Sequence, residues 1–174
     1  ASMASALRLP RILRATGAPA LAVLTTVLSA GCHSAPGSPT ASASDEWTRR
    51  YSLTPGGEVQ ITNRNGPVTV TAADGETVDV RVVRTVKAPT ETAANDLLAK
   101  VEIREDVRPD HVELQTVGIE GILINVSWSL HYHVRAPKTA IVRIRSNNGA
   151  VDVGGFSGRV IATTVTQPDG KTRA

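Results

Sequence analysis

The stretch Val59-Gln-Ile-Thr-Asn-Arg-Asn-Gly-Pro-Val-Thr-Val70 recurs as Ile141-Val-Arg-Ile-Arg-Ser-Asn-Asn-Gly-Ala-Val-Asp-Val153 and decides how this chain folds. The two copies share residues at a constant spacing of 83 positions. The identical pairs are Val59 and Val142, Ile61 and Ile144, Asn65 and Asn148, Gly66 and Gly149, Val68 and Val151, Val70 and Val153, and Gly75 and Gly158. Such a repeat, with its alternation preserved, indicates one structural unit used twice.

Each copy reads as strand, turn, strand, turn and strand. Aliphatic residues alternate with polar ones on both sides of Asn65-Gly66 and again up to Asp74-Gly75. Alternation predicts half-buried strands, and these dipeptides predict tight turns that tolerate positive φ. We therefore expect structural roles for the turn residues Asn65, Gly66, Gly75, Asn148, Gly149 and Gly158. Strands at this spacing can coil so that inward valines stack between rungs, which predicts an all-β fold, a β-solenoid resembling a right-handed β-helix. A β-sandwich is the alternative.

The segment between the two copies predicts one short helix and three strands. Thr90 to Lys100 begins with a capping hydroxyl and carries alanine and leucine at helical spacing, so we expect one short helix inserted between the two repeats. The strands expected after it are Val101 to Glu105, His111 to Val117 and Ile122 to Val134. In the last of these, Trp128 and Tyr132 share a face with aliphatic residues and are expected to fill the core.

The N-terminal segment, residues 1–31, reads as a lipoprotein signal peptide. Three arginines (Arg8, Arg11 and Arg14) precede an uncharged apolar run, which is shorter than the roughly 20 residues of a transmembrane helix. The run ends in Leu28-Ser-Ala-Gly-Cys32, which resembles a bacterial lipobox, and Cys32 is the only cysteine. We expect Cys32 to carry a thioether-linked diacylglycerol. That assignment places the chain after residue 31 outside the cytoplasm.

The remaining chain divides into three parts. Residues 32–46, the lipidated cysteine followed by small and polar residues, predict a flexible tether. Residues 47–164 form the expected β-repeat domain, and residues 165–174 a polar tail. The chain carries 19 Lys and Arg against 16 Asp and Glu, but three of the arginines lie in the signal peptide and no acid does, so the rest is formally neutral. Nucleic acid is therefore not an expected partner.

These residues carry a family resemblance. The repeated Asn-Gly phrase, over about residues 50–164, resembles the putative adhesin family of bacterial domains of unknown function. The resemblance implies an exported β-repeat protein with a helical excursion between repeats, and it brings no catalytic residues. Family members usually continue with further Asn-Gly rungs, whereas this chain has no third copy after Val165, as expected of a truncated member.

Two clusters of side chains suggest chemistry beyond folding. His131 and His133 lie two apart on one strand face, a spacing that lets both imidazoles reach one metal ion, but no third ligand is nearby and we expect no metal. Four arginines could align as a basic stripe toward anionic envelope polymers: Arg81, Arg84, Arg143 and Arg145. The alternative is that they lie outward on strands and discourage edge-to-edge pairing.

The function expected from the sequence is that of a non-catalytic cell-envelope lipoprotein, an adhesin-like or envelope interaction module. It would be held to the membrane by the lipid anchor at Cys32 and bind an envelope or surface macromolecule, without a cofactor. The alternative is an extracytoplasmic carrier of a small or lipidic ligand. Its cleft would lie between the segments Ile122 to Val134 and Thr90 to Lys100.

Overall fold

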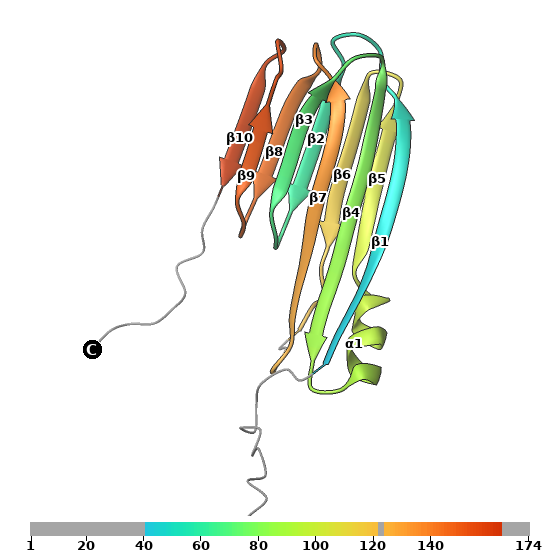
Figure 1. Cartoon of the computed structure of the whole chain (residues 1–174), viewed down its shortest axis with the longest axis vertical. Helices are drawn as coiled ribbons and strands as arrows, with labels where there is room; N and C mark the ends of the chain where they lie inside the picture. Colours follow the sequence, from blue (N-terminus) through green and yellow to red (C-terminus); the bar gives the residue numbers. More distant parts are fainter. Residues whose placement is uncertain (1–40, 122–123, 165–174) are drawn as a thin grey trace, which may run out of the picture. The chain divides into compact units, whose positions relative to one another are not determined.

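The structure is a computed structural model that describes residues 41–121 and 124–164. Its elements, in chain order, are β1 (Ala41–Ser52), β2 (Glu58–Asn63), β3 (Val68–Ala73), β4 (Thr77–Ala88), α1 (Glu91–Leu98), β5 (Glu102–Arg108), β6 (His111–Val117), β7 (Ser127–Pro137), β8 (Ile141–Ser146), β9 (Val151–Gly154) and β10 (Val160–Thr164). The expectation of a predominantly β chain with one short helix is confirmed (Figure 1).

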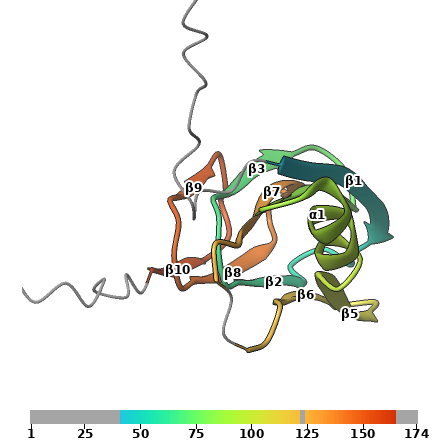
Figure 2. The ribbon, with the colours of Figure 1, turned by 90° about the horizontal axis from the view of Figure 1, so that it is seen from below.

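The strands form two mixed sheets that face each other (Figure 2). Sheet A has the order β1-β4-β7-β3-β9, and sheet B has the order β10-β8-β2-β6-β5. Among the described strands, the chain stays in one sheet from β3 to β4 and from β5 to β6, and at every other step between successive strands it passes to the other sheet. The two copies of the repeated phrase therefore each place one strand in sheet B and the next in sheet A.

The two copies stack in register, as the repeat predicts. Val59 and Ile61 of β2 pair in parallel with Val142 and Ile144 of β8. In sheet A, β3 and β9 pair in the same way, with Val68 opposite Val151. The Asn-Gly turns that follow β2 and β8, here called the corners, also stack. The Asn148 side-chain amide donates to Asn65 Oδ1 at 3.1 Å. The constant spacing in sequence thus becomes direct contact between equivalent residues.

The core consists of inward side chains from both sheets. Branched aliphatic residues dominate it because β-branched side chains pack well on a pleated surface. The largest fully buried residues are Tyr132, Leu53, Ile61, Leu114, Leu130, Val59, Val68, Val70, Val78, Val82, Val86 and Val101. Tyr132 is therefore a core residue as expected, and Trp128 packs partly buried against the same cluster. The outermost repeat valines, Val151 and Val153, are half-buried.

The helix is confirmed within two residues at each end. Thr90 caps it, its hydroxyl accepting from the Ala93 N–H at 3.2 Å, and Glu91 lies in the first turn. Ala94 and Leu98 are buried, and the helix packs against β1 and β4 at one end of the sheets (Figure 1). Lys100, the last residue of the expected helical segment, lies beyond the helix end.

The expected start of the β domain at residue 47 is wrong. β1 begins at Ala41, inside the segment expected to be a tether, and pairs antiparallel with β4 as far as Ala88. The small residues that argued against a core position are tolerated because backbone hydrogen bonds form the ladder and Ala43 alone reaches the interior. The strand expected at 122–134 is also shifted, because β7 spans Ser127–Pro137.

The expected signal peptide, Cys32 and the polar tail lie outside the described residues. Within residues 41–121 and 124–164, no helix is long and apolar enough to cross a membrane.

Candidate functional site: a groove on the outer face of sheet A

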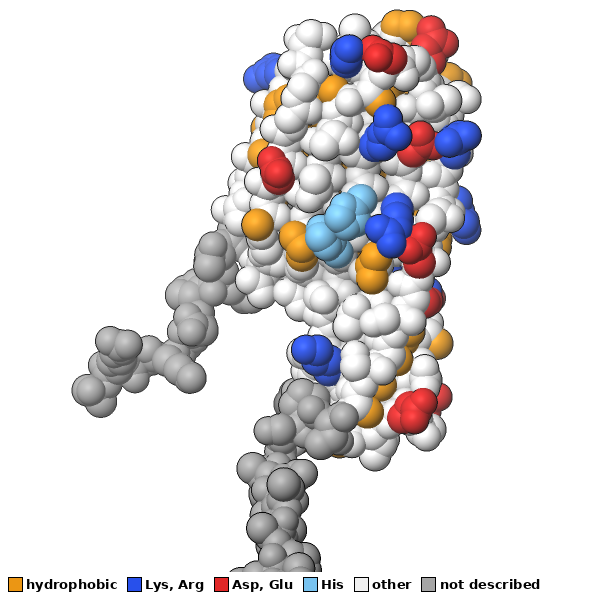
Figure 3. Space-filling model, in the orientation of Figure 1, with side chains coloured by type: hydrophobic (Ala, Val, Ile, Leu, Met, Phe, Trp, Pro, Cys, Tyr) orange, Lys and Arg blue, Asp and Glu red, His pale blue; other side chains and the backbone are white. Residues whose placement is uncertain are grey.

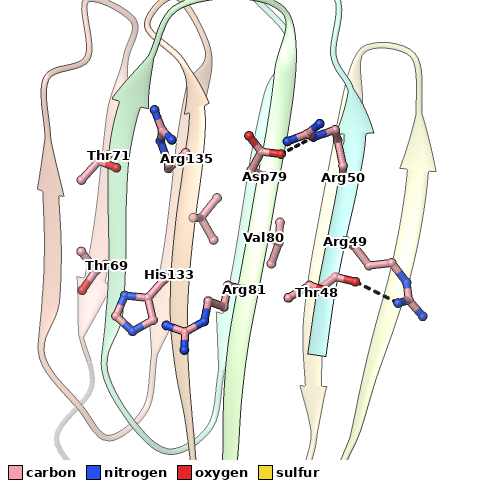
Figure 4. Close-up of a pocket in the computed structure, with 11 residues that line it drawn as sticks. Thr48, Arg49, Arg50, Thr69, Thr71, Asp79, Val80, Arg81, His133 and Arg135 are labelled. Carbon is pink, nitrogen blue, oxygen red and sulfur yellow. Dashed lines mark hydrogen bonds and ion pairs between the residues drawn. The ribbon is translucent and has the colours of Figure 1, made fainter. Parts of the chain in front are cut away.

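A groove of about 740 Å³ runs across the outer face of sheet A. Because successive strand residues point to opposite sides, every second residue of β1, β4, β7 and β3 faces it. The strand register sets two rows across the sheet. One row is Thr48, Arg81, His133 and Thr69, and the next is Arg50, Asp79, Arg135 and Thr71. Figure 4 shows these side chains projecting from four neighbouring strands.

Ion pairs hold three of the four arginines that line the groove, and one of these, Arg49, lies 3.7 Å from Glu105 of β5. Arg81 contacts Glu46 of β1 at 2.6 Å, and this hydrogen bond holds the pKa of the Glu46 carboxyl below its usual range. Arg50 binds Asp79 (Figure 4). Arg135 also lines the groove and makes no ion pair within the described part of the chain. The groove therefore offers one guanidinium that is free to bind a ligand.

The two histidines lie together on this face (Figure 3). The rings of His131 and His133 are 3.9 Å apart between centroids and tilted by 36°. Burial lowers the pKa of His131 from that of a free imidazole, and the neighbouring His133 and Arg81 lower it further. The imidazole of His131 is therefore mainly neutral near pH 7 and can donate one hydrogen bond and accept another. Among the described residues no group of three or more His, Cys, Asp and Glu could hold a metal ion.

The groove presents hydroxyl, guanidinium, imidazole and carboxylate groups on one rigid surface. Thr69 and Thr71 supply hydroxyls, and neighbouring strands hold the charged groups at fixed separations. Such a mixture suits a hydrated ligand rich in hydroxyl and acidic groups, because it can both donate and accept hydrogen bonds. Its breadth across four strands suits a polymer better than a small compact molecule.

The basic stripe that the four arginines could have formed is absent among the described residues. Arg81 faces outward on sheet A, whereas Arg143 and Arg145 lie on sheet B, and Arg143 binds Glu58 at 3.0 Å. Arg84 has the parity of the inward valines of β4, and it donates to Asp45 at 2.8 Å and to the Val101 carbonyl. Of these four arginines, the structure therefore places only one in the groove.

The predicted turn residues lie at the corners where the chain changes direction. Asn65-Gly66 and Asn148-Gly149 stack on each other between the sheets, with the Gly66 N–H donating to the Asn148 carbonyl at 2.7 Å. Gly75 lies in the turn between β3 and β4. Gly158 has a different role from the one its turn predicts, because its φ is not positive and a Cβ there would lie 2.2 Å from the Ala140 carbonyl oxygen.

A buried polar hub, which the sequence analysis missed, supports the first corner. The Asn63 amide donates to the carbonyls of Gly66 at 2.9 Å and Leu130 at 3.0 Å, and its Oδ1 accepts from Thr116 at 3.0 Å. Thr116 is in turn 2.8 Å from the Tyr132 hydroxyl, whose pKa burial raises to about 12. The signal in the sequence was an asparagine that continues the inward alternation of β2.

The sequence and the fold can be compared with those of known proteins. No protein family and no curated protein matches the sequence. Several solved structures are similar. A putative cell adhesion protein from Clostridium sporogenes matches with a TM-score of 0.45 and 8% identity over 70% of this chain and 57% of that one. A putative adhesin from Bacteroides fragilis matches with a TM-score of 0.34 and 13% identity over 70% of this chain and 50% of that one. A putative adhesin from Parabacteroides merdae matches with a TM-score of 0.32 and 11% identity over 62% of this chain and 39% of that one. This chain spans about half the length of these proteins.

Proposed function

We propose that this protein is a non-catalytic, adhesin-like interaction module of the bacterial cell envelope. It binds a hydrated surface polymer rich in sugar hydroxyls and acidic groups through the outer face of sheet A. The observation that carries this proposal is the groove of about 740 Å³ whose polar side chains come from four adjacent strands. The resemblance of the Asn-Gly repeat to the putative adhesin family supports the same class of function.

The scaffold proposed for this module is a flattened β-solenoid. The parallel pairing of β8 with both β2 and β10, and of β9 with β3, supports a coil in which each pass adds one strand to each sheet. A coil of this kind suits a binding surface because every rung repeats the same outward positions.

The groove is tested by removing its ligand-facing groups without disturbing the fold. We expect the double variant His133→Ala and Arg135→Ala to lose at least about tenfold in affinity for purified envelope polysaccharide, since one lost charged hydrogen bond alone is worth about 1.5 kcal/mol or more. Retention on an immobilised polysaccharide fraction measures it. Lys87→Ala is the matched control, because Lys87 is exposed on β4, the neighbour of β7 in sheet A, but does not line the groove. Equal retention of the double variant and the control would contradict this site.

The proposed attachment to the membrane rests on Cys32 and the signal-like segment before it. Two or three acyl chains on one residue give stable anchoring, and replacing Cys32 removes the sulfur to which they would be attached. We expect Cys32→Ala to move the protein from the membrane fraction to the soluble extracytoplasmic fraction almost completely. Immunoblots of separated fractions measure this, with His33→Ala as the neighbouring control. A Cys32→Ala protein that stays with the membrane would argue against lipidation.

A further inference from the structure

A second hollow, of about 460 Å³, lies on the outer face of sheet B and collects three arginines without ion-pair partners. Arg64, Arg104 and Arg145 all line it, and none of them makes an ion pair within the residues that the structure describes. Other arginines on β5 and β8, by contrast, do form ion pairs. Arg108 of β5 binds Asp106 at 2.7 Å, and Arg143 of β8 binds Glu58 at 3.0 Å. On these two strands, the arginines outside the hollow are therefore ion-paired, and the arginines that line it are not.

The strand register explains why the arginines surround a hollow. One row across sheet B reads Arg104, Gln115, Thr62 and Arg145, from β5 through β6 and β2 to β8. Two long side chains thus flank two shorter ones. Since neighbouring strands are about 4.8 Å apart, the Cα atoms of Arg104 and Arg145 are separated by roughly 14 Å. Arg64 follows the end of β2 and closes the hollow along the strand direction.

The remaining lining groups favour an anion. Gln115, Thr62 and Asn147 contribute amide and hydroxyl donors, and Glu120 is the one carboxylate among the lining residues. Each guanidinium can bind an oxyanion through two parallel hydrogen bonds, as carboxylate and phosphate groups require. The separation of Arg104 and Arg145 suits a ligand that carries more than one such group.

We propose that this hollow binds a polyanionic chain bearing repeated phosphate or carboxylate groups, on the face of the molecule opposite the sheet A groove. The site goes beyond the function proposed above, because the two faces share no lining residue and can bind independently. Nucleic acid is the less suitable polyanion, because the lining residues include no aromatic ring on which a base could stack.

The test compares ligands and variants by calorimetric titration of the full chain at low ionic strength. The probes are inorganic phosphate, linear polyphosphate, oligogalacturonate and single-stranded DNA of similar charge. The variant Arg104→Gln with Arg145→Gln is compared with Lys87→Gln with Arg159→Gln, which removes the same charge from residues that do not line the hollow. Thermal unfolding confirms that both variants are folded.

We expect the chain to bind polyphosphate or oligogalacturonate at least about tenfold more tightly than inorganic phosphate. The Arg104→Gln and Arg145→Gln variant should lose at least tenfold in affinity, and the control less than threefold. The stronger of the two polymers identifies phosphate or carboxylate as the source of the anion. An equal loss in both variants would show diffuse attraction instead of a site. Absence of binding, inorganic phosphate binding as tightly as the polymers, or a preference for DNA would each overturn the proposal.

Discussion

Replacing Gly66 with alanine is expected to lower the free energy of unfolding by about 3 kcal/mol or more. Gly66 has a φ of 113°, which L-residues rarely adopt, and a Cβ there would lie 2.4 Å from the Leu130 carbonyl oxygen. That contact is with backbone of β7, so relief requires moving the neighbouring strand. The Asn65-Gly66 turn, which stacks on Asn148-Gly149 of the second copy, would be distorted as the strand moves.

Gly75 provides the matched control for this substitution. Its φ is 103°, close to that of Gly66, but a Cβ there would meet nothing within 4 Å. Gly75→Ala therefore pays only the backbone strain and should cost about 1 kcal/mol. Urea unfolding of the two variants, with equal m-values, gives the difference. If both variants lost the same stability, the close approach of Gly66 to β7 would not be the reason for the glycine.

Replacing Asn63 with alanine is expected to cost about 3 kcal/mol of unfolding free energy. The substitution removes two donated hydrogen bonds and two accepted ones, and it leaves the Gly66 and Leu130 carbonyls without these donors in the interior. Buried polar groups that lose their partners keep the full cost of desolvation. Chemical denaturation measures the loss, and amide hydrogen exchange should show faster opening at Leu130 than elsewhere in β7.

Asn148→Ala is the comparison for the asparagine hub. Asn148 is exposed, and the hydrogen bond its side chain makes is to Asn65 Oδ1 on the equivalent corner. Its replacement should change stability by about 0.5 kcal/mol, as for most surface substitutions. A similar loss in the Asn63 and Asn148 variants would mean that the corner ladder, and not the buried network, stabilises this end of the molecule.

The sequence predicted those features that depend on local pattern. Alternating valines located the paired strands of both copies, and Asn65-Gly66 located their first corner. The capping hydroxyl of Thr90 located the helix start, because the signal for a helix end lies within a few residues. The register between copies was also predictable, since an identical spacing places equivalent residues side by side.

Features that depend on distant partners were not predictable in the same way. β1 begins early because β4 offers a backbone ladder to Ala41, and nothing in the residues near Ala41 records that partner. The groove depends on the register between four strands, so Thr48 and Arg135 come to line one surface only in the folded sheet. Whether the four arginines align could not be decided from the sequence, because alternation alone does not say which sheet a strand joins.

The pairing of the two copies also governs the order in which the molecule can assemble. Both neighbours of β2, the strands β6 and β8, occur later in the chain, and the partner residue of Val59 in β8 is Val142. A large loop must close before this ladder forms, so the entropy cost precedes the gain in packing. Folding should then be slow, on the order of milliseconds to seconds, and should depend on completing both halves together. Until the second half is present, one side of β2 is open to pairing with other chains.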